Sequence, residues 1–253
     1  MPVRDTPWPA GTPCWVDVAV PDVTLATAFY SAVLGWSFID SGEAFGNYHV
    51  AQVDGRAAAA IGPAAQGDAP PRWTVYLATD DADATAKLIT EHGGSLLVEP
   101  ADVAGNGRMA VALDPTGGAF GVWQSAGMIG FGITAEPGAV TWTDARLSDV
   151  ERGKGFFAAV FGHAFEPVPD APGGYANLLV AGEPVGGIVG TPGGVPSHWL
   201  TYFSVADVDA AEAVAARAGA AVLMPAEDTP FGRMGIFTDP FGATFALHQA
   251  LEG

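Results

Sequence analysis

Two distant stretches of the chain follow one pattern. Residues Trp73 to Asp83 read W-T-V-Y-L-A-T-D-D-A-D, and residues Trp199 to Asp209 read W-L-T-Y-F-S-V-A-D-V-D, at an offset of 126 positions. The triplet Gly107-Arg108-Met109 also recurs, as Gly232-Arg233-Met234. Self-similarity at a nearly constant offset indicates repeated structural units. The sequence therefore predicts that the second half of the chain duplicates the first.

The duplication extends toward the start of each half. Trp15-Val16-Asp17 is matched by Trp142-Thr143-Asp144, and Phe29–Gly35 is matched by Phe156–Gly162. The glycine-rich stretch Ser125 to Gly138 between the halves is typical of a linker. We therefore expect two domains, formed by residues 1–128 and 129–253.

Each half divides again into two similar modules. In the first module, residues 15–20 alternate like a strand, and Asp22 is placed to cap a helix that ends at Gly35. Three further short strands follow, and the same order of elements recurs in every module. In the third module, Ser148-x-x-Glu151 is a candidate capping box. The predicted fold class is α+β, with four βαβββ modules in series.

Composition narrows the classes of partner. The 253 residues carry a formal net charge of -18 and only 10 Lys and Arg, so no basic surface for nucleic acid or anionic membranes is expected. A neutral or cationic small molecule is compatible with this charge. The single cysteine, Cys14, excludes an intrachain disulfide. Residues 1–13 are polar and proline-rich, and no apolar run is long enough to span a membrane, which predicts a cytoplasmic protein.

Several motifs resemble those of the vicinal-oxygen-chelate superfamily, which includes glyoxalases, bleomycin-resistance proteins and extradiol dioxygenases. They are the helix end Phe29-Tyr30-x3-Leu34-Gly35-Trp36, the triplet Gly107-Arg108-Met109, and the turns Asp114-Pro115-Thr116-Gly117 and Asp239-Pro240-Phe241-Gly242. The resemblance implies that the four modules pair into two glyoxalase-like open β-barrel domains, each with a pocket. Because this fold carries many chemistries, it does not specify a reaction.

The resemblance also implies where metal ligands would stand. Two of those positions hold Trp15 and Trp142 on the first strand of each half, and two hold Gly121 and Ala246 on the last strand. The remaining positions carry no histidine or carboxylate either. Divalent cations need such ligands, so we expect no metal and no cofactor.

Aromatic side chains stand at the pocket positions instead. The candidate ligand-binding residues are Trp15, Tyr48, Trp73, Tyr76 and Trp123 in the first half, and Trp142, Tyr175, Trp199, Tyr202 and His248 in the second. Aromatic walls would suit a planar organic ligand. The alternative is that these rings only fill the core.

Two carboxylates follow the strand-one tryptophans. Asp17 and Asp144 lie two residues after them, on the same side of the strand. Each is either part of a structural salt bridge or a group that contacts the ligand, and the candidate partners are Arg108, Arg146 and Arg233. The candidate catalytic residues are Asp17, Asp144 and His248.

Three functions remain open at this point. The first is a metal-free protein that binds a hydrophobic, partly aromatic small molecule, in antibiotic sequestration or as an accessory in secondary metabolism. The second is a lyase, isomerase or oxygenase that is metal-independent or has a non-standard site, and the third is a metal enzyme of the family. A duplicated chain can act as a monomer, and a homodimer is the alternative. If one pocket functions, we expect it to be the second, because His248 can donate and accept protons.

Overall fold

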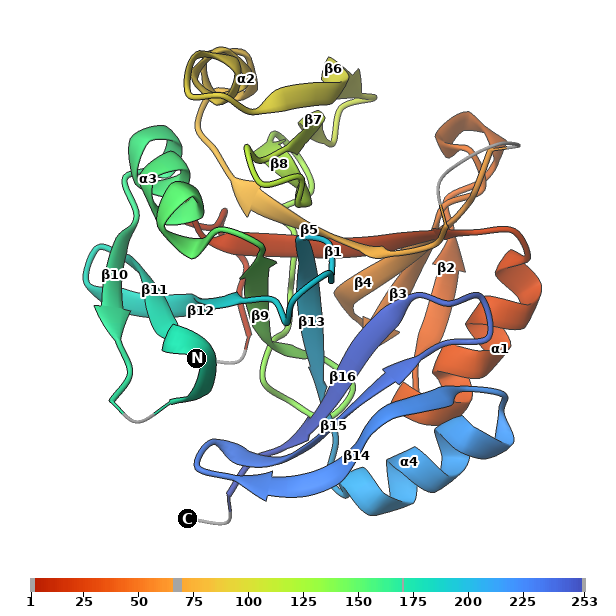
Figure 1. The fold of residues 1–253 in the computed structure, drawn as a ribbon. Coiled ribbons are helices and arrows are strands. Elements are labelled where there is room, and N and C mark those ends of the chain that lie inside the picture. Colours follow the sequence, from red (N-terminus) through yellow and green to blue (C-terminus); the bar gives the residue numbers. More distant parts are fainter. Residues whose placement is uncertain (1–2, 66–69, 170, 252–253) are drawn as a thin grey trace.

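Each half of the chain forms one eight-stranded sheet with two α-helices (Figure 1). The computed structural model describes residues 3–65, 70–169 and 171–251. The first half contains β1 (Pro13–Val20), α1 (Val23–Leu34), β2 (Ser37–Asp40), η1 (Glu43–Phe45), β3 (His49–Val53), β4 (Arg56–Pro63), β5 (Trp73–Ala78), α2 (Ala82–Glu91), β6 (Ser95–Val103), β7 (Gly107–Leu113) and β8 (Ala119–Ser125). The second half contains β9 (Val140–Leu147), α3 (Val150–Phe161), β10 (Ala164–Pro167), η2 (Pro172–Gly174), β11 (Ala176–Val180), β12 (Glu183–Gly190), β13 (His198–Ser204), α4 (Val208–Arg217), β14 (Ala221–Thr229), β15 (Gly232–Thr238) and β16 (Thr244–Gln249).

The two sheets have the same strand order. The first runs β2-β3-β4-β1-β5-β8-β7-β6, and the second runs β10-β11-β12-β9-β13-β16-β15-β14. Modules join through antiparallel pairs at the centre, β1 with β5 and β9 with β13. The predicted α+β class and the four βαβββ modules are confirmed. The sheets are curled and open, since their outer strands do not pair with each other.

Aspartates begin all four helices of the described residues. Asp22, for example, accepts a hydrogen bond from the Leu25 amide at 2.9 Å, and Gly35 ends the same helix in the left-handed conformation (φ 72°). In α3 the cap is Asp149 and not Ser148, so the predicted capping box is wrong. The hydroxyl of Ser148 instead accepts a hydrogen bond from Ser197 at 3.1 Å.

The halves pack against each other through helices and aromatic rings. Helix α1 contacts α4, and α2 contacts α3 (Figure 1). Between the central strands, the rings of Trp73 and Phe203 have centroids 5.1 Å apart. The buried hydroxyl of Tyr30 donates to the Asp239 carboxylate of the other half at 2.9 Å. These contacts form the core that joins the two sheets.

The inter-half segment, residues 126–139, lies along the first half. The amide of Phe131 donates to the Cys14 carbonyl at 2.7 Å, and the amide of Gly132 donates to the Ala57 carbonyl at 2.8 Å. Phe131 is 2% exposed. The segment predicted as a linker is therefore also a packed part of the first half.

In the part of the chain that the structure describes, no helix has the length and apolar character needed to cross a membrane.

Candidate functional site

Side chains alternate between the two faces of the central strands, and this separates core from site. On β5, Trp73, Val75 and Leu77 face the core between the halves, whereas Thr74 and Tyr76 face the opposite side. The corresponding side of the second sheet carries Trp142, Asp144 and Tyr202. We call these two surfaces the first cup and the second cup.

A buried carboxylate organises the floor of the second cup. Asp144 is 3% exposed. It accepts hydrogen bonds from the hydroxyls of Tyr202 at 2.7 Å and Tyr175 at 2.8 Å, and from the Trp142 indole N–H at 3.0 Å. The Arg146 guanidinium lies 3.9 Å away and also donates to the Tyr202 hydroxyl at 2.8 Å. Asp144 thus holds three aromatic side chains in fixed orientations.

Burial raises the pKa of the Asp144 carboxyl above its ordinary value, while the phenol donors and Arg146 oppose the shift. Burial and the adjacent carboxylate also raise the pKa of Tyr175 and Tyr202. Both phenols therefore keep their protons near neutral pH and remain hydrogen-bond donors to the carboxylate. These hydrogen bonds therefore fix the positions of the side chains, and they do not provide a proton that is readily transferred.

A large cavity opens above this floor. Its volume is about 670 Å³, within the range of roughly 300–1,000 Å³ that is usual for small-molecule pockets. Besides the floor residues, its apolar and aromatic lining includes Pro184, Val189, Met224, Phe231, Met234 and Ile236. Two carboxylates, Glu227 and Asp228, also line the cavity, and Asp228 is paired with Arg233 at 3.0 Å. A mostly apolar cavity with a few polar groups suits an organic ligand.

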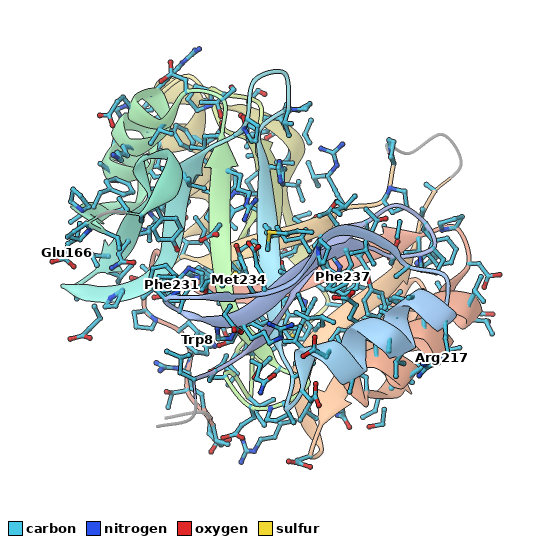
Figure 2. All side chains as sticks on the ribbon, turned by 60° about the horizontal axis from the view of Figure 1, so that its bottom comes forward. Trp8, Glu166, Arg217, Phe231, Met234 and Phe237 are labelled. Carbon is cyan, nitrogen blue, oxygen red and sulfur yellow. The ribbon has the colours of Figure 1, made fainter. Side chains whose placement is uncertain are left out.

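The hairpin between β14 and β15 forms one wall of the cavity. Phe231 stands at its tip, and Met234 and Phe237 follow along β15 (Figure 2). Phe231 is 51% exposed, and its ring centroid lies 6.1 Å from that of Tyr175 on the opposite wall. His248 belongs to the same lining, and its Nε2 lies 2.8 Å from the Phe231 carbonyl. Because a carbonyl only accepts, Nε2 carries the proton.

The first cup has a similar floor, but its tryptophan does not reach the carboxylate and it lacks the arginine. Asp17 accepts hydrogen bonds from the hydroxyls of Tyr48 at 2.8 Å and Tyr76 at 3.1 Å, and the Trp15 indole donates to Tyr48 at 3.0 Å. Ala19 stands at the position that Arg146 has in the second half. Burial raises the pKa of Asp17 to about 6, against the hydrogen bonds of the two tyrosines.

Phe131 covers the tryptophan of the first cup. Its ring centroid is 5.7 Å from that of Trp15, and its carbonyl accepts a hydrogen bond from the Trp8 indole at 3.1 Å. The repeat-related Trp142, in contrast, lines the large cavity. The two cups therefore differ in what lies against the same tryptophan.

Three of the predicted pocket residues lie elsewhere. Trp73 and Trp199 are 3% and 4% exposed and pack in the core between the halves, so their placement on the pocket wall is corrected. Each lies three residues before a cup tyrosine, and an odd spacing puts two strand residues on opposite faces. Trp123 faces a smaller cavity of about 200 Å³ and donates to the Met128 carbonyl at 2.9 Å.

Of the three arginines expected to pair with Asp17 or Asp144, only Arg146 does so. Arg108 binds Asp83 at 2.8 Å, and Arg233 binds Asp209 at 2.8 Å, both on exposed surfaces outside the cups. Arg108 and Arg233 are therefore wrong as partners, because each lies on a hairpin strand and binds the first turn of the preceding helix rather than the cup floor.

The residues at the implied ligand positions do not fit a metal. The indoles of Trp15 and Trp142 donate hydrogen bonds and offer no lone pair to a cation. A side chain at Gly121 would collide with the ring of Tyr76. Over residues 3–65, 70–169 and 171–251, no three side chains of His, Cys, Asp or Glu gather as a metal site.

Phe231 and Phe131 are the aromatic residues at these sites that the sequence patterns did not indicate. Both break the repeat: Phe231 corresponds to Asn106, and Phe131 lies between the repeated units. These two residues could have been found by comparing where the two halves differ, because the shared motifs do not include them.

Four βαβββ modules in two curled open sheets, each with an aromatic cup, define a tandem protein of the glyoxalase type. The chain belongs to the glyoxalase/bleomycin resistance protein/dioxygenase superfamily, whose family model matches residues 14–122 and 126–247.

Relatives of nearly the same length carry two kinds of name. The chain is 36% identical over 255 residues to the Mycobacterium bovis protein named "Putative glyoxylase CFP32", covering 98% of this chain and 97% of the relative. It is also 36% identical over 262 residues to "Anthracycline biosynthesis protein DnrV" of Streptomyces peucetius, covering 96% and 94%.

Solved structures share the fold at low identity. The Mn(II)-bound glyoxalase from Novosphingobium aromaticivorans superposes with a TM-score of 0.66 at 19% identity, over 96% of this chain and 83% of that one. The 2,3-dioxygenase LapB from Pseudomonas sp. KL28 also gives 0.66, at 16% identity, over 96% and 94%. These likenesses concern the fold alone.

Proposed function

We propose that the second cup binds a planar, largely apolar organic molecule without a metal. The observation that carries this proposal is the cavity of about 670 Å³, whose floor is fixed by hydrogen bonds to Asp144 and whose walls are aromatic and apolar. The rings of Trp142, Tyr175 and Tyr202 are held before a ligand arrives, which reduces the entropy cost of binding.

The charge of the floor favours a ligand that is neutral where it contacts the floor. Asp144 and Arg146 lie 3.9 Å apart and offset each other. The carboxylate already receives hydrogen bonds from two phenols and one indole. A role in secondary metabolism is supported by the relative named as an anthracycline biosynthesis protein, which we take to this chain as part of the proposal.

Binding is tested by calorimetry and tryptophan fluorescence. A panel of planar three- and four-ring aromatic compounds is compared with flexible aliphatic compounds of similar size. We expect saturable binding of planar compounds, one per chain, with quenching that is lost in Trp142→Phe. Binding should persist in the presence of a chelator. If no planar compound binds, or if chelation abolishes binding, the proposal fails.

A matched pair of variants locates the site. Met234 lines the cavity, and Met109 occupies the repeat-related position in the first half. Met234→Trp should fill the cavity and weaken binding at least tenfold, whereas Met109→Trp should leave the affinity unchanged. Equal effects of both substitutions would contradict a site in the second cup.

A second candidate function is metal-independent proton transfer, as in a lyase or isomerase. It is favoured by His248, which lines the cavity and whose buried Nδ1 has no hydrogen-bond partner among the described residues. Such a nitrogen is a candidate general base. His248→Gln should then abolish turnover of a bound compound while leaving its affinity within a few fold. Turnover that survives this substitution would exclude the role.

A further inference from the structure

The first cup contains a carboxylate that has no cation. Asp17 is partly exposed, and its only hydrogen bonds within the described part of the chain come from Tyr48 and Tyr76, both to Oδ2. No Lys, Arg or His of the described residues lies within 4 Å of it, whereas Asp144 has Arg146 at 3.9 Å. Arg108 is held by Asp83 and Asp102 at 2.8 Å each. A charge in this setting is costly unless something pairs with it.

The second oxygen of Asp17 is available. Oδ2 accepts from both tyrosines, and Oδ1 neither makes a hydrogen bond with the described residues nor belongs to their buried polar atoms without partners. The free Oδ1 is therefore accessible to an incoming donor. In the second cup both oxygens of Asp144 are occupied, Oδ1 by Tyr175 and Trp142 and Oδ2 by Tyr202.

Three aromatic side chains gather at the Asp17 carboxylate through a hydrogen-bond chain that ends on Oδ2. Trp15 and Tyr48 are joined by a hydrogen bond of 3.0 Å, and Tyr76 approaches from the neighbouring strand. Aromatic faces attract cations through their quadrupole, and cages of such rings recognise organic ammonium groups. An accessible carboxylate oxygen next to such a group of aromatic side chains offers an ammonium group both a negative charge and aromatic surface.

Phe131 limits the size of what fits. Its buried ring already lies against Trp15, at a centroid distance of 5.7 Å. The chain itself thus occupies the space against Trp15, whereas the repeat-related Trp142 lines the cavity of about 670 Å³ in the second cup. A small head group fits this setting better than a polycyclic ring.

We propose that the first cup is a separate binding site for a small organic ammonium group, held by Asp17 and the rings of Trp15, Tyr48 and Tyr76. The two cups then differ in charge: the first recognises a cation, and the second a neutral planar molecule. The difference follows from one position: strand β1 has Ala19 where strand β9 has Arg146.

Choline serves as the probe, and 3,3-dimethyl-1-butanol is its uncharged control of nearly the same shape. The indole N–H signal of Trp15 is followed by NMR at constant ionic strength. We expect a saturable shift of this signal with choline and at least tenfold weaker binding of the alcohol. No saturable shift, equal shifts with both compounds, or a shift confined to Trp142 would overturn the proposal.

Two variants separate the charge from the fold. Asp17→Asn keeps an oxygen for the tyrosine donors and should abolish choline binding. Ala19→Arg changes an exposed position and places a guanidinium where the second half has Arg146, so it should weaken binding at least tenfold while Asp17 is retained. Thermal unfolding checks that both variants fold. If Ala19→Arg does not fold, the result with Asp17→Asn alone tests the proposal. Choline binding unaffected in the folded variants contradicts the proposal.

The result of the choline test does not depend on whether the second cup has the proposed function. Met234→Trp blocks the second cup and should leave choline binding unchanged. A protein that binds choline but no planar compound would refute the proposed function alone, and the reverse result would refute this inference alone.

Discussion

Replacing Asp17 with asparagine should make the stability of the protein less dependent on pH. Burial raises the pKa of Asp17 from 3.8 to about 6 in the folded protein. A raised carboxyl pKa means that protonation favours the folded state, so this contribution is complete below pH 3.8 and is lost as the pH rises through 6. Since one pKa unit corresponds to about 1.4 kcal/mol, the ionised carboxylate costs about 3 kcal/mol at pH 8.

Asparagine removes this cost because it stays neutral. Its oxygen can still accept from Tyr48 and Tyr76, and its amide can point to the accessible side. At pH 8 the variant should exceed the wild type in free energy of unfolding by about 3 kcal/mol, and at pH 4 by about 0.6 kcal/mol. The titratable groups that face the carboxylate are these two tyrosines, and burial together with Asp17 raises the pKa of both, so they remain neutral over this range.

Urea unfolding at pH 4, 5, 6, 7 and 8 measures the difference between wild type and variant. Comparing the two proteins at each pH cancels the titration of all other carboxylates. A difference that does not change with pH, or one that is larger at pH 4 than at pH 8, would refute the assignment of an unpaired, partly desolvated charge to Asp17.

Three further substitutions test the core and the cups. Tyr30→Phe removes the donor to buried Asp239 across the two halves and should lower the free energy of unfolding by about 1.5–3 kcal/mol, as urea titration would measure. Burial lowers the pKa of His163 from 6.5 to about 4, so stability should fall as the pH drops from 6.5 toward 4; His163→Gln should remove this part of the acid sensitivity, and equal acid profiles would contradict it. Gly121→Ala places a methyl group against the ring of Tyr76 and should destabilise the first half, visible as a lower midpoint of thermal unfolding; an unchanged midpoint would show that the ring moves freely.

Much of the site could be anticipated from repeated residues. The matched Trp-x-Asp triplets at Trp15 and Trp142 placed two carboxylates beside two indoles, and the cup tyrosines followed from the same repeat. The structure brings them together as predicted for Asp17 and Asp144. The placement of Trp73 and Trp199 failed although the necessary rule was at hand, because residues three apart on a strand lie on opposite faces.

Other features depend on parts of the chain that lack repeat partners. Phe231 is at a hairpin tip where the first half has Asn106, and no periodicity constrains such a position. The position of Phe131 against Trp15 depends on the path of the inter-half segment. A glycine-rich sequence does not predict that path.

The sequence by itself determined the duplication, the order of elements in each module and both ends of helix α1, because strand alternation, an aspartate cap and a closing glycine act over a few residues. Only the tertiary structure decided which face of each sheet is core and which is cup, that Arg146 alone among three candidate arginines reaches a cup carboxylate, and that the large cavity lies above Asp144. These outcomes depend on the packing of the two halves and on the course of the segment between them, which bring together groups far apart in the chain.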